Sequence, residues 1–171
     1  MARNVEVKAR IDGIEALLPR ARALADGPAQ RLLQDDTFFA CTPGRLKLRE
    51  FGDGTGELIH SERRDADGPK LSDYVRAPTA DPAALREALA RAHGVIGRVR
   101  KTRWLLMCGA TRIHLDDVEG LGAFVELEVV LREGQTEGEG AAIAHGLLAR
   151  LGVEPSQLVA GAYLDYMCNL P

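Results

Sequence analysis

The stretch Asn4-Val5-Glu6-Val7-Lys8-Ala9-Arg10-Ile11 alternates strictly between polar and apolar residues. A period of two is typical of a β-strand with one apolar face, because successive side chains point to opposite faces. The polar face carries one carboxylate, Glu6, followed by two cations, Lys8 and Arg10. A strand whose polar side faces plain solvent tolerates any polar residue, so a defined charge order on that side indicates a functional surface.

Working outward, the same pattern of one apolar and one charged face returns along the chain. In the stretch 45–50 the face opposite two leucines is entirely basic, and in 124–131 the apolar positions alternate with Glu126 and Glu128. The predicted strands cover residues 4–11, 30–40, 45–50, 57–63, 70–77, 95–108, 111–118 and 124–131.

Helical spacing of apolar residues predicts about three helices, over residues 14–25, 82–93 and 137–151. Asp81 and Pro82 suit the start of the second, and Gly94 suits its end. Pro19 lies inside the first predicted helix, where its missing backbone donor predicts a kink or a break.

The bulk composition is that of an ordinary globular chain, with 46% hydrophobic and 27% charged residues. We expect a single domain over residues 1–171. A net charge of -3 and 5% aromatic residues argue against nucleic acid or a membrane as partner. The three separated cysteines, Cys41, Cys108 and Cys168, predict reduced thiols and not a disulfide framework. We expect a cytoplasmic protein, and a homodimer is a compatible assembly.

Short turns between neighbouring strands predict antiparallel pairing and a mainly β, α+β fold. From the pattern alone, an open sheet with solvated charged faces is the simpler interpretation. The composition of the charged face favours instead an eight-stranded antiparallel closed barrel, a tunnel with a charged interior and helices on its outside. The cations of that face are Lys8, Arg10, Arg45, Lys47, Arg49, Lys70, Arg76, Lys101, Arg103 and Arg112. Its carboxylates are Glu6, Asp116, Glu126 and Glu128.

Many cations beside a few carboxylates suit a polyanion held with a divalent metal, because cations neutralise phosphate oxygens and carboxylates hold a hard cation. Converging carboxylates would repel one another without such an ion, and Mg²⁺ or Mn²⁺ is the natural partner. Solvated or salt-bridged glutamates, and a basic edge that discourages aggregation, are the alternatives. His114 is either a ligand or proton shuttle, or a structural residue, which is the commoner role of a lone histidine on a strand.

The motifs Asn4-x-Glu6-x-Lys8, Thr111 to Gly122 and Phe124-Val125-Glu126-Leu127-Glu128 resemble the CYTH superfamily, also called triphosphate tunnel metalloenzymes. The segment DDVEGLG followed by ELE is similar in particular to the class IV adenylyl cyclase branch. The resemblance covers nearly the whole chain in order. It implies a tunnel that binds a linear triphosphate with Mg²⁺ or Mn²⁺ held by carboxylates.

By matching position, the resemblance implies that the metal ligands or their neighbours are Glu6, Asp116, Glu126 and Glu128. It implies phosphate binding by Lys8, Arg45, Lys47, Arg49, Lys70, Lys101 and Arg103, and we add Arg10 and Arg112 to this basic set from the charged strand faces. Within that set, Lys8, Arg49 and Lys101 are the residues to which we assign catalytic roles.

The chain departs from the family pattern at Asn4, which stands where a first glutamate is expected. An amide oxygen can still coordinate a cation. Residues 70–77 contain only one carboxylate, Asp73, so one bound metal is favoured over two. The resemblance points to a cyclase that converts ATP to cyclic AMP and pyrophosphate. A triphosphatase acting on an inorganic or organic triphosphate is the alternative, and a polyphosphate- or nucleotide-binding module is the non-enzymatic one.

Overall fold

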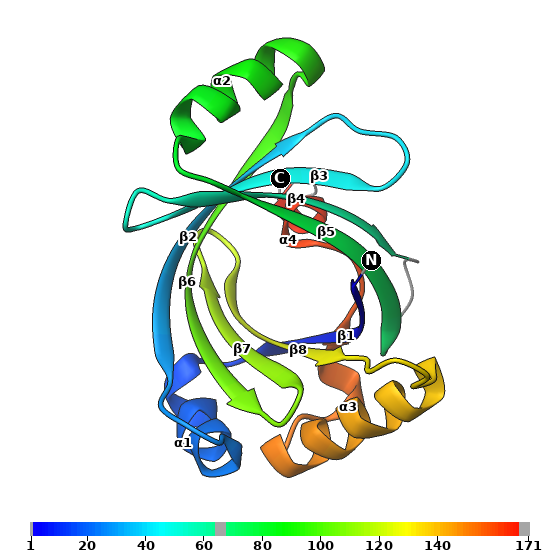
Figure 1. Cartoon of the computed structure of the whole chain (residues 1–171). Helices are drawn as coiled ribbons and strands as arrows, with labels where there is room; N and C mark the ends of the chain where they lie inside the picture. The colour runs from blue at the N-terminus through cyan, green and yellow to red at the C-terminus, as the bar shows by residue number, and fades with distance from the viewer. Residues whose placement is uncertain (1, 64–67, 168–171) are drawn as a thin grey trace.

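A computed structural model, which describes residues 2–63 and 68–167, shows a closed antiparallel barrel (Figure 1). Eight strands pair around it in the order β5-β4-β3-β2-β6-β7-β8-β1, and β1 pairs again with β5. Their bounds are β1 (Ala2–Ile11), β2 (Gln30–Phe39), β3 (Arg45–Phe51), β4 (Gly56–Arg63), β5 (Lys70–Thr79), β6 (Val95–Cys108), β7 (Thr111–Val118) and β8 (Gly122–Val130). The predicted fold class is therefore confirmed, and the alternative of an open sheet is wrong.

The opening strand β1 closes the barrel. One of its edges pairs with β8 along residues 4–11. The other edge is divided: residues 2–6 pair with β5, and Lys8 and Ala9 pair with a ninth short strand, β9 (Leu158–Val159). Pairing β1 on both edges removes the exposed edge that an open sheet would leave.

Two helices, α1 (Ile14–Leu24) and α3 (Glu137–Leu151), cover the outside of the barrel over β1, β7 and β8 (Figure 1). They bury the apolar faces of these strands in one cluster with Val7, Leu127 and Leu148. The helix α2 (Pro82–His93) lies on the opposite side, against β2 and β3. Helices outside an apolar strand face leave the polar face to line the interior, as the alternation predicted.

Pro19 lies inside α1 and does not break it, so of the two predicted outcomes, a kink or a break, the break is wrong. Proline removes one backbone donor, but the neighbouring Leu17 and Ala21 are buried against the barrel and hold the helix in place. Packing therefore outweighs the local preference at this position.

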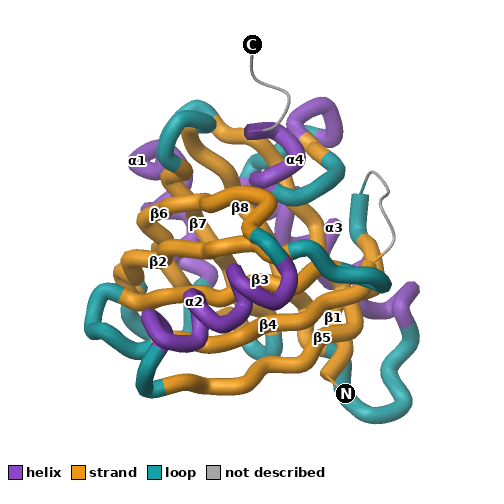
Figure 2. Tube along the Cα trace, turned by 90° about the horizontal axis from the view of Figure 1, so that it is seen from above, coloured by secondary structure: helices purple, strands orange, loops and turns teal. Residues whose placement is uncertain are grey.

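The C-terminal segment closes one end of the barrel. It contains a 3₁₀ turn, η1 (Pro155–Gln157), then β9 and a short helix, α4 (Tyr163–Met167). Figures 1 and 2 both place α4 at an end of the barrel, within the ring of strands. It packs in a second apolar cluster with Phe38, Val99 and Phe124. Leu164 sits directly over Gly97 of β6, where any side chain would collide with it.

Cys41 and Cys108 are free thiols, as predicted, and Cys168 lies outside the described residues. None of the helices in the part of the chain that the structure describes combines the length and the apolarity of a membrane span.

Candidate functional site

Strand register brings the charged residues of β1, β7 and β8 together inside the barrel. Glu126 lies opposite Lys8 on one side and opposite His114 on the other. One step along, Glu128 lies opposite Glu6 and Arg112. Opposite residues in an antiparallel ladder have Cβ atoms about 5 Å apart. We call Glu6, Glu126 and Glu128 the carboxylate wall.

Cations partly balance the carboxylate wall. Lys8 Nζ lies 3.0 Å from Glu126 Oε2, and Arg112 donates to Glu128 at 3.2 Å. His114 Nδ1 lies 3.3 Å from Glu126 Oε1 and 3.8 Å from Glu128 Oε1. Burial acts to raise the pKa values of both glutamates, but these neighbouring charges outweigh it and lower them. Both carboxylates are therefore ionised at neutral pH, as metal ligands must be.

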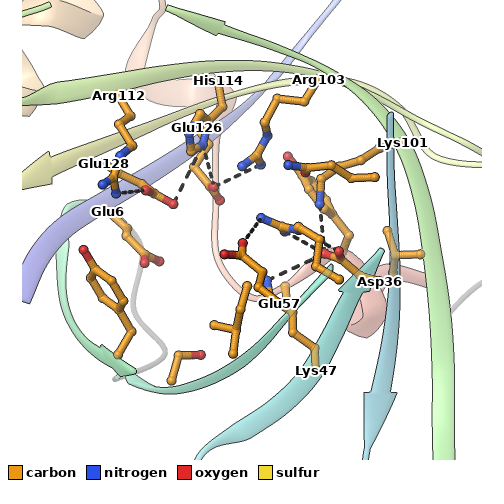
Figure 3. Close-up of a pocket in the computed structure, with 18 of the residues that line it drawn as sticks. Glu6, Asp36, Lys47, Glu57, Lys101, Arg103, Arg112, His114, Glu126 and Glu128 are labelled. Atoms are coloured by element: carbon orange, nitrogen blue, oxygen red, sulfur yellow. Dashed lines mark hydrogen bonds and ion pairs between the residues drawn. The ribbon is translucent and has the colours of Figure 1, made fainter. Parts of the chain in front are cut away.

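The opposite wall is basic and is organised around one buried carboxylate, Asp36. Arg49 of β3 donates to both of its oxygens at 2.7 Å, and Lys101 of β6 donates at 3.1 Å. Lys47 Nζ lies 3.7 Å from Asp36 Oδ2. We call Lys47, Arg49 and Lys101 the cation wall. In the strand order, β3 stands four positions from β8, and β2 stands four positions from β1, so the two walls face each other across the barrel (Figure 3).

Burial sets the protonation of the cation wall. Desolvation lowers the pKa of Lys101 to about 7, against the opposing charge of Asp36 and helped by Arg49 and Arg103. Burial would raise the pKa of Asp36, but Arg49, Lys101 and Lys47 together hold it well below its ordinary value. This side of the barrel therefore holds an ionised carboxylate, Asp36, and a lysine, Lys101, whose charge changes near neutral pH.

Between the walls, Arg103 makes a bidentate pair with Asp116, with both N–O distances 2.6 Å. Tyr163 of α4 donates its hydroxyl to Asp116 at 2.8 Å, and its ring lies 4.0 Å from Lys8 Nζ. Burial raises the pKa of Asp116, but Arg103 more than offsets it and brings the value to about 2. The helix that closes the barrel is thereby tied to the charged interior.

The walls enclose a cavity of about 210 Å³. Eight lysine and arginine side chains line it, against five carboxylates. This excess of positive charge, in a water-poor setting, suits an anion with several charges. A divalent cation at the carboxylate wall would increase the excess further.

The structure brings most of the predicted site residues to this cavity. Those that line it are Glu6, Lys8, Arg45, Lys47, Arg49, Lys101, Arg103, Arg112, Glu126 and Glu128. Lys70 is buried opposite Glu6, behind the lining.

Two predicted residues are placed differently. Asp116 is wholly buried and engaged by Arg103 and Tyr163, apart from the carboxylate wall. Arg10 is exposed, donates to the Leu121 carbonyl at 2.8 Å and lies over the Phe124 ring at 4.6 Å. The strict alternation of the opening stretch put Arg10 on the correct face of β1, but the strand leaves the cavity before reaching it.

Sequence reasoning missed Asp36, Glu57 and Tyr163. Glu57 accepts two hydrogen bonds from Arg76, at 2.9 and 2.5 Å, and lines the cavity. Asp36 alternates with Gln34 and Phe38 on β2, and all three line the cavity, so its period-two position was the available signal. Tyr163 carried no signal, because its place depends on how the C-terminal segment folds back.

The fold and the facing charged walls define a tunnel whose interior carries many cations beside a cluster of carboxylates. A model of the CYTH domain matches residues 2–163, and the chain belongs to this family. Members of the family process triphosphate substrates and depend in general on a metal. A comparison with curated proteins gives no significant match.

Solved structures with the same fold include a protein from Pyrococcus horikoshii, with 24% identity and a TM-score of 0.85 over 95% of this chain and 98% of that one. A candidate adenylate cyclase from Vibrio parahaemolyticus has 17% identity and a TM-score of 0.74, covering 96% and 97% of the two chains. A candidate adenylyl cyclase from Hippeastrum, described as having a dominant triphosphatase activity, has 16% identity and a TM-score of 0.64, over 90% and 89%. Similarity at these identities shows the shared fold.

Replacing Asp116 with asparagine should destabilise the protein. The variant leaves the buried Arg103 guanidinium without its main partner, and breaking a buried pair in this way costs about 3–5 kcal/mol of unfolding free energy. The matched control is Asp117→Asn, on the exposed face of the same strand, for which we expect a change within about 0.5 kcal/mol. Urea denaturation measures both, and equal small effects would contradict the structural role of Asp116.

Binding of tripolyphosphate at pH 8 should be accompanied by proton uptake. Lys101 is mostly neutral above its pKa of about 7, and a nearby phosphate raises that pKa, so the complex takes up roughly one proton. Calorimetry in buffers of different ionisation enthalpy measures the uptake, with Mg²⁺ present throughout. Lys101→Arg keeps a permanent charge and should bind while taking up much less. Undiminished uptake in that variant would show that Lys101 is not the group that titrates.

Proposed function

We propose that the protein is a metal-dependent enzyme that hydrolyses a phosphoanhydride bond of a triphosphate. The observation that carries the proposal is the pair of facing walls, with carboxylates on β1 and β8 and a lysine–arginine cluster on β3 and β6, across one cavity. A triphosphate needs both neutralisation of its oxygens and a bridging cation, and these walls offer the groups for each.

Glu6, Glu126 and Glu128 are the residues that would hold Mg²⁺ or Mn²⁺. They fit such an ion because the carboxylates of Glu126 and Glu128 lie close together and are held ionised by their surroundings, and Glu6 lies opposite Glu128 in the strand ladder. Hard divalent cations prefer oxygen ligands of this kind. When bound, the metal polarises phosphoryl oxygens and supplies a nucleophilic water at neutral pH.

The cation wall would bind the oxygens of the phosphate chain. Arg49 presents a planar guanidinium already fixed by Asp36, and Lys47 and Lys101 lie within 4 Å of the same carboxylate. A group held in place before substrate arrives stabilises developing charge without reorganising. Asp36 therefore acts as a positioning residue: it keeps three cations together, where they would otherwise repel one another.

Arg103 and Arg112 lie between the walls, on β6 and β7, and line the same cavity. Arg103 Nη2 is 3.5 Å from Glu126 Oε1 while its other contacts go to Asp116. It can therefore turn one donor from Glu126 to a phosphate oxygen without losing the Asp116 pair. Charge that develops on a transferring phosphoryl group would be stabilised from both sides of the tunnel.

The size of the cavity supports hydrolysis as the reaction. Pockets that enclose a whole drug-sized ligand measure about 300–1,000 Å³, whereas this one measures about 210 Å³, and half of the residues that line it are charged. A phosphate chain suits such a space better than a complete nucleoside triphosphate does. Cyclisation of ATP is the second candidate, favoured by the resemblance of residues 111–128 to class IV adenylyl cyclases.

Turnover assays with tripolyphosphate and with ATP, each with Mg²⁺ and with Mn²⁺, test the proposal. We expect phosphate release from tripolyphosphate, and Glu126→Gln should lower it by at least about 100-fold, because the substitution removes a charged metal ligand. Chelation of the metal should abolish release in the unaltered protein.

The matched control is Glu119→Gln, at an exposed position of the β7–β8 turn, which should keep full activity and the same melting temperature. Cyclic AMP and pyrophosphate as the main products from ATP would replace hydrolysis with cyclisation. Tight binding of both compounds without turnover would overturn the enzyme proposal in favour of a binding module.

A further inference from the structure

We propose that His114 supplies a nitrogen ligand to the metal of this tunnel and makes the site prefer Mn²⁺ to Mg²⁺. The inference rests on the proposed metal site of the carboxylate wall and adds to it a donor of a different chemical kind. It concerns which ion the site selects, which is a separate question from the reaction.

The geometry places the imidazole among the carboxylates. His114 and two glutamates, Glu126 and Glu128, each present one ligand atom, and all three atoms lie within 4.8 Å of one another. The same ring nitrogen, Nδ1, faces both carboxylates, at 3.3 and 3.8 Å (Figure 3). A metal ion placed among them would take the place of the direct contact between Nδ1 and Glu126.

The ring is held in that orientation by the sheet. His114 is 3% exposed and lies opposite Glu126 on the β7–β8 ladder, with Leu105 opposite it on β6. The second oxygen of Glu126, Oε2, is held 3.0 Å from Lys8 Nζ. Glu126 therefore has its first oxygen directed to His114, and the two residues can share one ion without either side chain moving far.

Asn4 provides independent evidence for a ligand in this cavity. It lines the same cavity, two residues along β1 from Glu6, and is 2% exposed. Its side-chain oxygen has no hydrogen-bond partner within residues 2–63 and 68–167. A buried amide oxygen without a partner is costly, and a bound ion or its water would satisfy it.

These donors change the character of the site. Asn4 offers a neutral oxygen in place of a charged one, and His114 offers a neutral nitrogen. Mg²⁺ demands oxygen ligands in near-ideal octahedral geometry. Imidazole suits transition metals, and Mn²⁺ accepts carboxylate oxygens as well. A mixed set of two or three carboxylates with one imidazole therefore favours Mn²⁺.

Pulsed electron paramagnetic resonance of the Mn²⁺-loaded protein tests the assignment directly, because a coordinated imidazole gives a ¹⁴N coupling. We expect the coupling in the unaltered protein and its loss in His114→Gln. The matched control is His145→Gln, on the exposed side of α3, which should leave the coupling unchanged. A Mn²⁺ spectrum without ¹⁴N coupling in the unaltered protein overturns the proposal while leaving a metal-dependent enzyme intact.

Metal affinities measured by calorimetry provide a second readout that does not depend on turnover. His114→Gln should weaken Mn²⁺ binding by at least about 10-fold, the effect usual for losing a group that tunes a metal site, and should weaken Mg²⁺ binding far less. His114→Asp, which places a charged oxygen donor at this position, should strengthen Mg²⁺ binding relative to Mn²⁺ binding. Equal losses for both metals in His114→Gln, with the melting temperature unchanged, would contradict a role in selectivity. If neither Mn²⁺ nor Mg²⁺ binds the unaltered protein, the proposed function is overturned as well.

Discussion

The constraint on which the rest of the structure depends is the burial of charge inside a closed barrel. A charged group removed from water costs several kcal/mol unless it is paired and hydrogen-bonded. The interior meets this cost by binding each carboxylate to cations from other strands: Asp36 to Arg49 and Lys101, Asp116 to Arg103, and Glu126 to Lys8. Because the partners come from neighbouring strands, each pair forms only when those strands are paired in the correct register. The apolar faces and their helices supply the stability, and the charged faces set the register.

The same network prepares the site for ligands. Its cations are already gathered around Asp36 and its glutamates already converge, so an incoming triphosphate and its metal meet groups that need little rearrangement. The C-terminal segment belongs to this preparation, because Tyr163 holds Asp116 and lies against Lys8. Tyr163 of α4 lines the charged cavity, so α4 bounds the cavity on that side. The histidine among the glutamates then gives the carboxylate wall a donor that distinguishes one divalent ion from another.

Most of the fold and much of the candidate site could be predicted from the sequence, because strict alternation of polar and apolar residues shows which side chains share a strand face. Glu6, Lys8, Glu126 and Glu128 were placed in this way, and the structure puts all four at the cavity. Alternation does not give the register between strands, nor whether a residue lies at the cavity or beyond its end. Alternation put Arg10 among the phosphate-binding residues, although the end of β1 lies outside the cavity. It could not show that Arg103 forms an ion pair with Asp116. Asp36 was overlooked because its role depends on cations from the two strands that flank β2, which the sequence alone does not bring together. Tyr163 was overlooked because it belongs to a segment placed by tertiary packing.

The measurement that tests the account most directly is a crystal structure of the protein grown with tripolyphosphate and Mn²⁺. The account predicts the phosphate chain inside the barrel, with its oxygens on Lys47, Arg49 and Lys101. It predicts Mn²⁺ on Glu126 and Glu128, with Glu6 beside them, bridging to the same chain. A tunnel that keeps all its internal ion pairs, with the anion or the metal bound elsewhere on the surface, would contradict it.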